Sequence, residues 1–193
     1  MKDLVSFTYD FFGHVLPGLV VLISLSLLYV DVTNYKELVV LTEGINTGIG
    51  TVLVIASYII GFAINPIGRY VYRTLGFKIW PKKEKNPYKM DVSDKFALIR
   101  EDSPKNFEYI ERWNTYCAMS HNLSIASLLL ALVTVYKMIT DAFNMQIWLP
   151  FFLLSVFLFF VLVHRAVVFS IWAKDDVNAA LLRLKQQGEN SET

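Results

Sequence analysis

The chain has few of the residues on which redox, metal or nucleotide chemistry depends. Its 193 residues include one cysteine, Cys117, and three histidines. A single cysteine excludes an internal disulfide, and no Cys/His set has the spacing of a zinc site, so we expect no metal and no cofactor. The sequence also lacks a phosphate-binding loop, a dinucleotide fingerprint, an HExxH motif and a nucleophile elbow. We therefore expect that the protein is not an enzyme.

Charged residues are scarce in four apolar stretches. Hydrophobic residues make up 54% of the chain and the mean hydropathy is +0.43, more than a soluble domain of this size needs. Each stretch has close to the roughly 20 residues that a helix needs to cross about 30 Å of hydrocarbon. We predict an all-α integral membrane protein with four transmembrane helices, at about residues 11–30, 51–67, 118–139 and 147–172.

Two prolines indicate where helices end and begin between these spans. Asn65-Pro66 disfavours further helix, so we expect the second span to end there. Ser103-Pro104 has the composition of an N-cap and a first helical residue, which predicts one helix from Pro104 to about Ile139. The predicted organisation is a first transmembrane hairpin, a basic and partly helical cytoplasmic segment, a second transmembrane hairpin and a cytoplasmic tail, at residues 1–68, 69–112, 113–174 and 175–193.

Basic residues are distributed unevenly and predict the orientation. Residues 69–112 hold 11 of the 18 lysines and arginines, and the chain termini add most of the others. Only Lys36 and Lys137 fall in the two short connections on the opposite side. The positive-inside rule therefore places both termini and residues 69–112 in the cytoplasm, with the spans in a bacterial inner membrane. The net charge of +1 gives no electrostatic reason to expect direct nucleic-acid binding.

All three histidines fall at one predicted boundary of the membrane. One interpretation of this polar layer is that interfacial side chains are tolerated among lipid headgroups. The other is that they form a ring, which closes a pore at its cytoplasmic mouth or senses a partner or pH. The spans lack the carboxylates that usually couple transport to protons or cations, which argues against a proton-driven transporter. The residues of the layer are His14, Asn65, His121, Asn122, His164 and Arg165.

Small residues recur at helical spacing in the second and third spans. They permit close helix packing in lipid, where no hydrophobic force drives helices together; the alternative is the wall of an aqueous path. Four short spans enclose too little volume for a conduit in one copy, so we expect a homo-oligomer. The small residues are Ser57 and Gly61, then Ser120, Ser124, Ser127 and Ala131.

The basic segment also offers a contact surface. Lysines beside a membrane chiefly retain a loop in the cytoplasm and contact anionic lipid. The alternative is docking of an acidic protein surface or a nucleotide-like ligand. We expect the lipid bilayer and a cytosolic protein as partners. The candidate docking residues are Lys82, Lys83, Lys85, Lys89 and Arg112.

Several short motifs resemble those of small bacterial membrane proteins. They are Phe11-Phe12-Gly13 with Pro17-Gly18, Tyr58–Gly61 with Asn65 and Arg69, and the pair Arg112 and Asn122 at the start of the third span. The layout of four spans with cytoplasmic termini resembles the membrane subunit of the Kiwa phage-defence system. The resemblance implies an oligomeric membrane sensor or anchor that recruits a cytosolic effector, and it transfers no functional residue.

These observations leave three function hypotheses. The first is a non-enzymatic oligomeric membrane subunit that docks a cytosolic partner, with phage defence as the setting that the resemblance implies. The second is a pore-forming or membrane-depolarising effector. The third is a small transporter or lipid-modifying enzyme, which the missing carboxylates and motifs disfavour.

Overall fold

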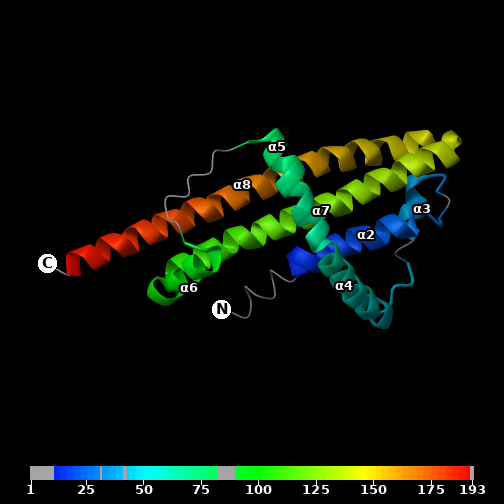
Figure 1. The fold of residues 1–193 in the computed structure, drawn as a ribbon. Coiled ribbons are helices and arrows are strands. Elements are labelled where there is room, and N and C mark those ends of the chain that lie inside the picture. Colours follow the sequence, from blue (N-terminus) through cyan, green and yellow to red (C-terminus); the bar gives the residue numbers. More distant parts are fainter. Residues whose placement is uncertain (1–10, 31, 41–42, 82–89, 192–193) are drawn as a thin grey trace.

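The computed structural model describes residues 11–30, 32–40, 43–81 and 90–191 (Figure 1). Within these ranges all regular elements are helices, which confirms the predicted all-α class. Three helical stretches of the described chain are long and apolar enough to cross a membrane: Thr47–Ile79, Pro104–Thr140 and Ala142–Gln187. The apolar helix at Phe11–Ser26 is shorter than these, so the fourth span stays a prediction.

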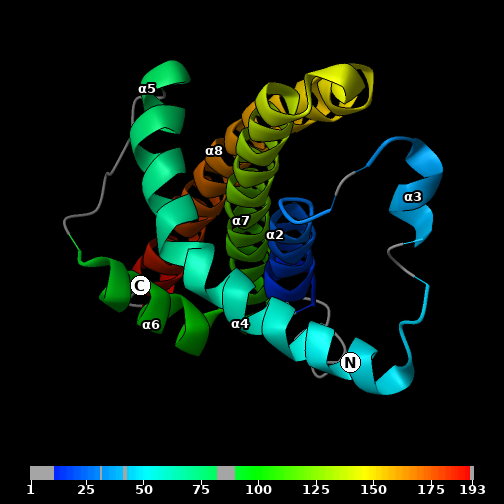
Figure 2. The same ribbon diagram turned by 90° about the vertical axis from the view of Figure 1, so that its right-hand side faces the viewer.

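The two longest helices form an antiparallel hairpin. The predicted helix from Pro104 is confirmed as α7, Pro104–Thr140, and a short 3-10 turn, η3 (Ala142–Asn144), leads to α8, Met145–Ser191. At 1.5 Å per residue α7 and α8 are about 55 and 70 Å long, roughly twice the thickness of a hydrocarbon core. They lie side by side along α7 (Figures 1 and 2). Acidic residues are absent from residues 113–140 and 145–173, next to the turn, whereas residues 104–112 and 174–187 carry many charges. The hairpin therefore has an apolar half beside the turn and a polar half at the other end.

The polar half of the hairpin is completed by α6, Val92–Asp102. This short helix packs on both long helices and encloses a small separate core, in which Ile99 and Ile110 are fully buried. Phe96 and Phe107 meet edge to face beside it, with 6.1 Å between ring centroids. We call this unit, made of α6, residues 104–116 of α7 and residues 169–187 of α8, the three-helix base. Its core residues are Ile99, Ile110, Val177, Ala180 and Leu181.

The N-terminal helix runs along the apolar half of α7. It consists of a π-helical turn, η1 (Phe11–Val15), and α2 (Leu16–Ser26), so it ends before the predicted residue 30. The Nζ of Lys137 donates to the carbonyl oxygen of Val30, 2.8 Å away. Helix termini leave carbonyl groups without intrahelical partners, and this contact ties the chain after α2 to α7. The short helix α3, Tyr35–Val40, follows, and the Tyr35 hydroxyl donates to the carbonyl oxygen of Gln146 at the start of α8, 3.2 Å away.

The second apolar helix does not end at its proline. α4 (Thr47–Val71) continues through Pro66 into a π-helical stretch, η2 (Tyr72–Gly76), and α5 (Phe77–Ile79). The prediction that Asn65-Pro66 ends this helix was therefore wrong. Proline removes one backbone hydrogen bond and disfavours helix locally, but this helix is held by packing on both sides of Pro66. The first residues of the predicted basic segment, 69–79, thus belong to the same long helix.

The direction of α4 also differs from a parallel four-helix arrangement. It lies across α2, α7 and α8 at a steep angle, and its first turns project away from the hairpin (Figures 1 and 2). At the crossing α4 contacts η1, α2 and α7, and its continuation η2 contacts α8. The crossing lies near the middle of α7 (Figure 1). It brings together residues from four distant parts of the sequence.

Candidate functional site at the helix crossing

Glycines let the backbone of α4 touch the N-terminal helix. A Cβ atom added at Gly18 of α2 would overlap the carbonyl oxygen of Ser57, and one added at Gly61 would overlap the carbonyl oxygen of His14. Ser57 is itself completely buried. Small residues four apart lie on one helix face and permit such backbone contact. Ser57 and Gly61 are therefore packing residues within one chain.

The same helix then crosses the hairpin, first with α4 and then with η2. A Cβ atom added at Gly68 would lie 2.6 Å from Nδ1 of His121 on α7, and one added at Gly76 would lie 2.6 Å from Cγ2 of Val167 on α8. Both distances are too short for real carbon contacts. One helix thus crosses three others in succession, and at each crossing a glycine of this helix leaves room for the neighbouring helix.

Four residues of the predicted polar layer meet at this crossing. Asn122 is fully buried and its Nδ2 donates to the carbonyl oxygen of Gly13, 2.8 Å away. The buried ring of His14 lies edge-on to Tyr58 and Phe62, with centroid distances of 5.6 and 5.7 Å. These contacts connect η1 to both α7 and α4. The four residues are His14, Asn65, His121 and Asn122.

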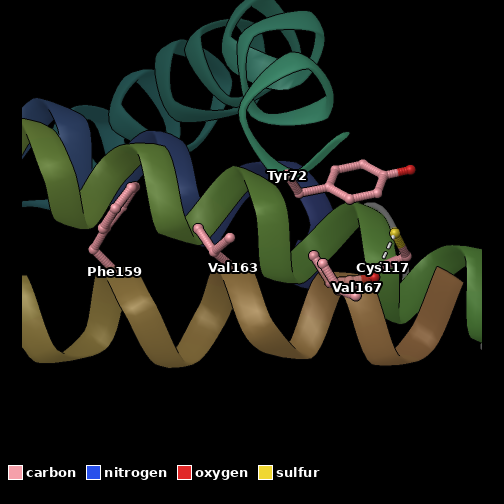
Figure 3. Close-up of a cluster of buried hydrophobic side chains, with 6 residues drawn as sticks. Tyr72, Cys117, Phe159, Val163 and Val167 are labelled. Atoms are coloured by element: carbon pink, nitrogen blue, oxygen red, sulfur yellow. Dashed lines mark hydrogen bonds between the residues drawn. The ribbon is translucent and has the colours of Figure 1, made fainter. Parts of the chain in front are cut away.

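His121 lies inside a packed region. Its ring stacks on Tyr72, with 5.3 Å between centroids and 9° between planes. Tyr72 packs against a core between α7 and α8, where the Cys117 thiol donates to the carbonyl oxygen of Ala166 at 3.3 Å (Figure 3). The other members of this core are Phe159, Val163 and Val167. The imidazole is therefore enclosed by helices of its own chain.

Several buried polar atoms at the crossing have no hydrogen-bond partner among the described residues. Leaving such an atom unpaired costs about 1–3 kcal/mol, so native structures usually satisfy it, often with ordered water. The atoms are Ser57 Oγ, Asn65 Oδ1, His121 Nδ1 and Asn122 Oδ1.

The two remaining members of the polar layer occupy a different environment. His164 and Arg165 are exposed on α8. The His164 ring lies edge-on to Trp80 with 5.0 Å between centroids, and the Arg165 guanidinium lies 6.0 Å from the centre of the Phe169 ring. In one protomer the six residues thus divide into three buried residues at the crossing, the half-buried Asn65 beside them, and an exposed pair.

The small-residue stripe of α7 is covered by the chain itself. Its members are all buried, and the Ser124 hydroxyl donates to the carbonyl oxygen of His121, 2.7 Å away. A hydroxyl that bonds to its own helix backbone adds no polar group to a surface. The stripe residues are Ser120, Ser124, Ser127 and Ala131.

The predicted docking residues divide between described and undescribed segments. Lys82, Lys83, Lys85 and Lys89 lie outside the described residues. Arg112 is exposed on α7 within the three-helix base, and its guanidinium lies 5.3 Å from the centre of the Tyr109 ring. Tyr109 is 57% exposed. The pair forms a protruding aromatic and cationic contact on the base.

Sequence reasoning missed a contact between the two hairpin helices. Trp113 Nε1 donates to Asp176 Oδ2 at 2.8 Å, and the Trp113 ring packs edge-on to Trp172 with 4.8 Å between centroids. Tyr116 and Phe169 complete this aromatic cluster. Tryptophan and tyrosine concentrate where a membrane meets water, and aromatic residues on both helices near Lys174 were the available signal. The cluster lies where the apolar half adjoins the three-helix base.

A metal site finds no support in the described ranges, where no group of three or more His, Cys, Asp or Glu side chains could hold an ion. Comparison of the chain with protein-family models, curated proteins and solved structures found no match. The function must therefore be argued from the geometry of this chain.

Proposed function

We propose that the protein is a non-enzymatic subunit of a bacterial inner membrane, which anchors through its apolar half and presents the three-helix base to a cytosolic protein. The observation that carries this proposal is the continuity of α7 and α8, each of which runs without a break from the apolar half into the base. A partner bound at the base would therefore contact the same two helices that α4 crosses.

The surface of the base supports a docking role. It has its own packed core, so it presents a rigid platform. Tyr109 and Arg112 protrude from it side by side, and tyrosine and arginine are enriched among the residues that dominate protein–protein binding. Nearby exposed side chains on α6 and α7 carry both signs of charge, for example Asp94, Lys105 and Glu108, which suits a polar rim around such a contact.

The environment of the polar layer favours this function over a pore. Helices of the same chain enclose His14, His121 and Asn122, and the small-residue stripe of α7 is buried within the protomer. A channel wall needs polar groups that face a shared opening. The pore-forming hypothesis therefore has less support than the anchor, and a small transporter has less still.

The first half of α4 supports an oligomeric subunit. Its large apolar side chains are exposed, with Val52 at 65% and Ile59 at 61%, while it projects away from the hairpin (Figure 2). An apolar helix without partners is stable only in lipid or against another protein surface. We propose that copies of this chain share that surface, and that the setting is the phage defence implied by the resemblance to the Kiwa membrane subunit.

Affinity purification in mild detergent tests the docking function. We expect the parent protein to retain a soluble protein in fixed stoichiometry, and the Tyr109→Ala/Arg112→Ala variant to lose it. Tyr136→Ala, an exposed tyrosine in the apolar half, is the matched control and should retain the partner. Equal retention by all three proteins would contradict docking at this face. Ion conductance in liposomes without a retained partner would favour the pore.

A further inference from the structure

Basic side chains lie on the outer surface at the level of the crossing. Arg69 and Arg73 are exposed on α4 and η2, and Gly68 beside them contacts His121 of α7. Arg165 of α8 lies at the same level, because the neighbouring Ala166 bonds to Cys117, one turn from His121. The three arginines therefore form a band around the hairpin where α4 crosses it.

The three apolar helical stretches around these arginines contain no acidic residue. Residues 44–79, 113–140 and 145–174 include no aspartate or glutamate, although they form the helices that meet at the crossing. Exposed arginines in stretches without aspartate or glutamate suit an anion as ligand. A guanidinium group offers a planar set of five donors that suits a phosphate.

Two of the arginines share an open hollow. The hollow is an open surface depression of about 510 Å³ along one side of α4 and η2, and this one helix supplies all of its lining residues. Arg73 Nε donates to the Tyr72 hydroxyl at 3.4 Å, which leaves its terminal nitrogens for another acceptor. The lining residues are Asn65, Pro66, Arg69, Tyr70, Arg73 and Thr74.

The surface beside the hollow is apolar. Phe62 is 61% exposed and lies seven residues before Arg69, on the same side of the helix, and Tyr70 of the hollow's own lining is 70% exposed. A soluble phosphate would neutralise the arginines but would leave these side chains uncovered. A phospholipid satisfies both surfaces, because its phosphate meets the arginines while its acyl chains cover the apolar residues.

We propose that Arg69 and Arg73 bind the phosphate of an anionic phospholipid. The two guanidinium groups hold the phosphate oxygens by charge-assisted hydrogen bonds, and the acyl chains lie along the exposed side of α4 that carries Phe62. The lipid would thereby occupy the outer side of the crossing, one helix face away from Gly68 and His121.

Thermal unfolding of the purified full chain in detergent tests the site. The added ligands are short-chain phosphatidylglycerol, short-chain phosphatidylcholine and inorganic phosphate. We expect saturating phosphatidylglycerol to raise the Tm of the parent by about 5 °C, and the other two ligands to raise it by less than half as much. The Arg69→Gln/Arg73→Gln variant should lose most of the phosphatidylglycerol shift.

A matched variant separates this site from general charge effects. Arg100→Gln/Arg183→Gln removes two exposed arginines of the three-helix base and should keep the full shift. If the glutamine variant at the hollow fails to fold, Arg69→Lys/Arg73→Lys replaces it, because lysine keeps the charge but loses the planar donor set. We expect the Tm shift of this variant with phosphatidylglycerol to be at least threefold smaller than that of the parent. The lipid site would be overturned if phosphatidylglycerol raised the Tm of the parent and of the hollow variants equally. It would also be overturned if inorganic phosphate raised the Tm of the parent as much as phosphatidylglycerol does.

Discussion

Asn122 of α7 donates from its buried side-chain nitrogen to the carbonyl oxygen of Gly13, 2.8 Å away and 109 residues earlier in the chain. This hydrogen bond joins the N-terminal helix to the hairpin beside the place where α4 crosses both. Because the π-helical turn at Phe11–Val15 surrounds Gly13, the bond also satisfies a carbonyl in an irregular part of a helix. The crossing thus depends on one specific polar contact as well as on small residues.

Asn122→Ala should destabilise the crossing. The substitution leaves the Gly13 carbonyl without this donor, and a buried unpaired group costs about 1–3 kcal/mol, so the Tm should fall by about 2–10 °C. Thermal unfolding in detergent measures the change. Asn114→Ala removes an exposed asparagine from the same helix and should leave the Tm within about 2 °C. A Tm of Asn122→Ala equal to that of this control would show that the bond is not needed.

Gly68→Ala should also lower stability, although alanine is the better helix former by about 1 kcal/mol. The new Cβ would lie 2.6 Å from Nδ1 and 2.7 Å from the carbonyl oxygen of His121, and overpacking of this kind costs about 1–3 kcal/mol. Gly50→Ala lies in the same helix with no atom within 4 Å of its added Cβ, so its Tm should stay or rise. If both substitutions raise the Tm, the close contact between α4 and α7 does not exist.

Cys117 should react slowly in the folded protein. The thiol is buried and bonds to the Ala166 carbonyl, so a maleimide reagent should modify it at least tenfold more slowly than it modifies Tyr116→Cys in a Cys117→Ser background. Tyr116 is the neighbouring residue and is 41% exposed. The same burial predicts no disulfide-linked dimer under oxidant. Rapid labelling of Cys117 in mild detergent would show that α7 and α8 separate there.

Glu37 should make the start of α3 sensitive to acid. Its pKa is lowered, first by the hydrogen bond from the Thr33 amide and also by those from the Thr33 hydroxyl and Asn34. A lowered folded-state pKa means that the ionised carboxylate stabilises this turn. That stabilisation is present above the unfolded pKa and is lost as pH falls through the folded pKa.

Nuclear magnetic resonance of the Thr33 amide measures this effect. The ordinary pKa of a glutamate side chain is 4.5. We expect the chemical shift of the amide to titrate with a midpoint below this value, and Glu37→Gln to abolish the titration. Glu43→Gln, a substitution in the same connection, should leave the titration unchanged. A midpoint at or above the ordinary value would contradict the hydrogen-bonded carboxylate.

Local sequence patterns were sufficient to predict several helices, but they did not predict which side chains are buried at the helix crossing. The start of α7 followed from Ser103-Pro104, because the preference of proline for the first helical position is local. His14, His121 and His164 could all be assigned to one layer by their depth along the spans. Depth along a helix does not tell which face another helix covers, so the burial of His14 and His121 and the exposure of His164 could not be predicted.

The sequence by itself determined the all-helical class, the apolar stretches and the long helix from Pro104, because hydropathy and helix-terminal preferences act over a few turns. Only the tertiary structure decided that α4 continues through Pro66 and lies across the other helices. Proline costs a helix about 3 kcal/mol locally, but backbone contacts at Gly61 and Gly68 hold the helix on either side of it. Those contacts join residues far apart in the chain, and no local pattern records them.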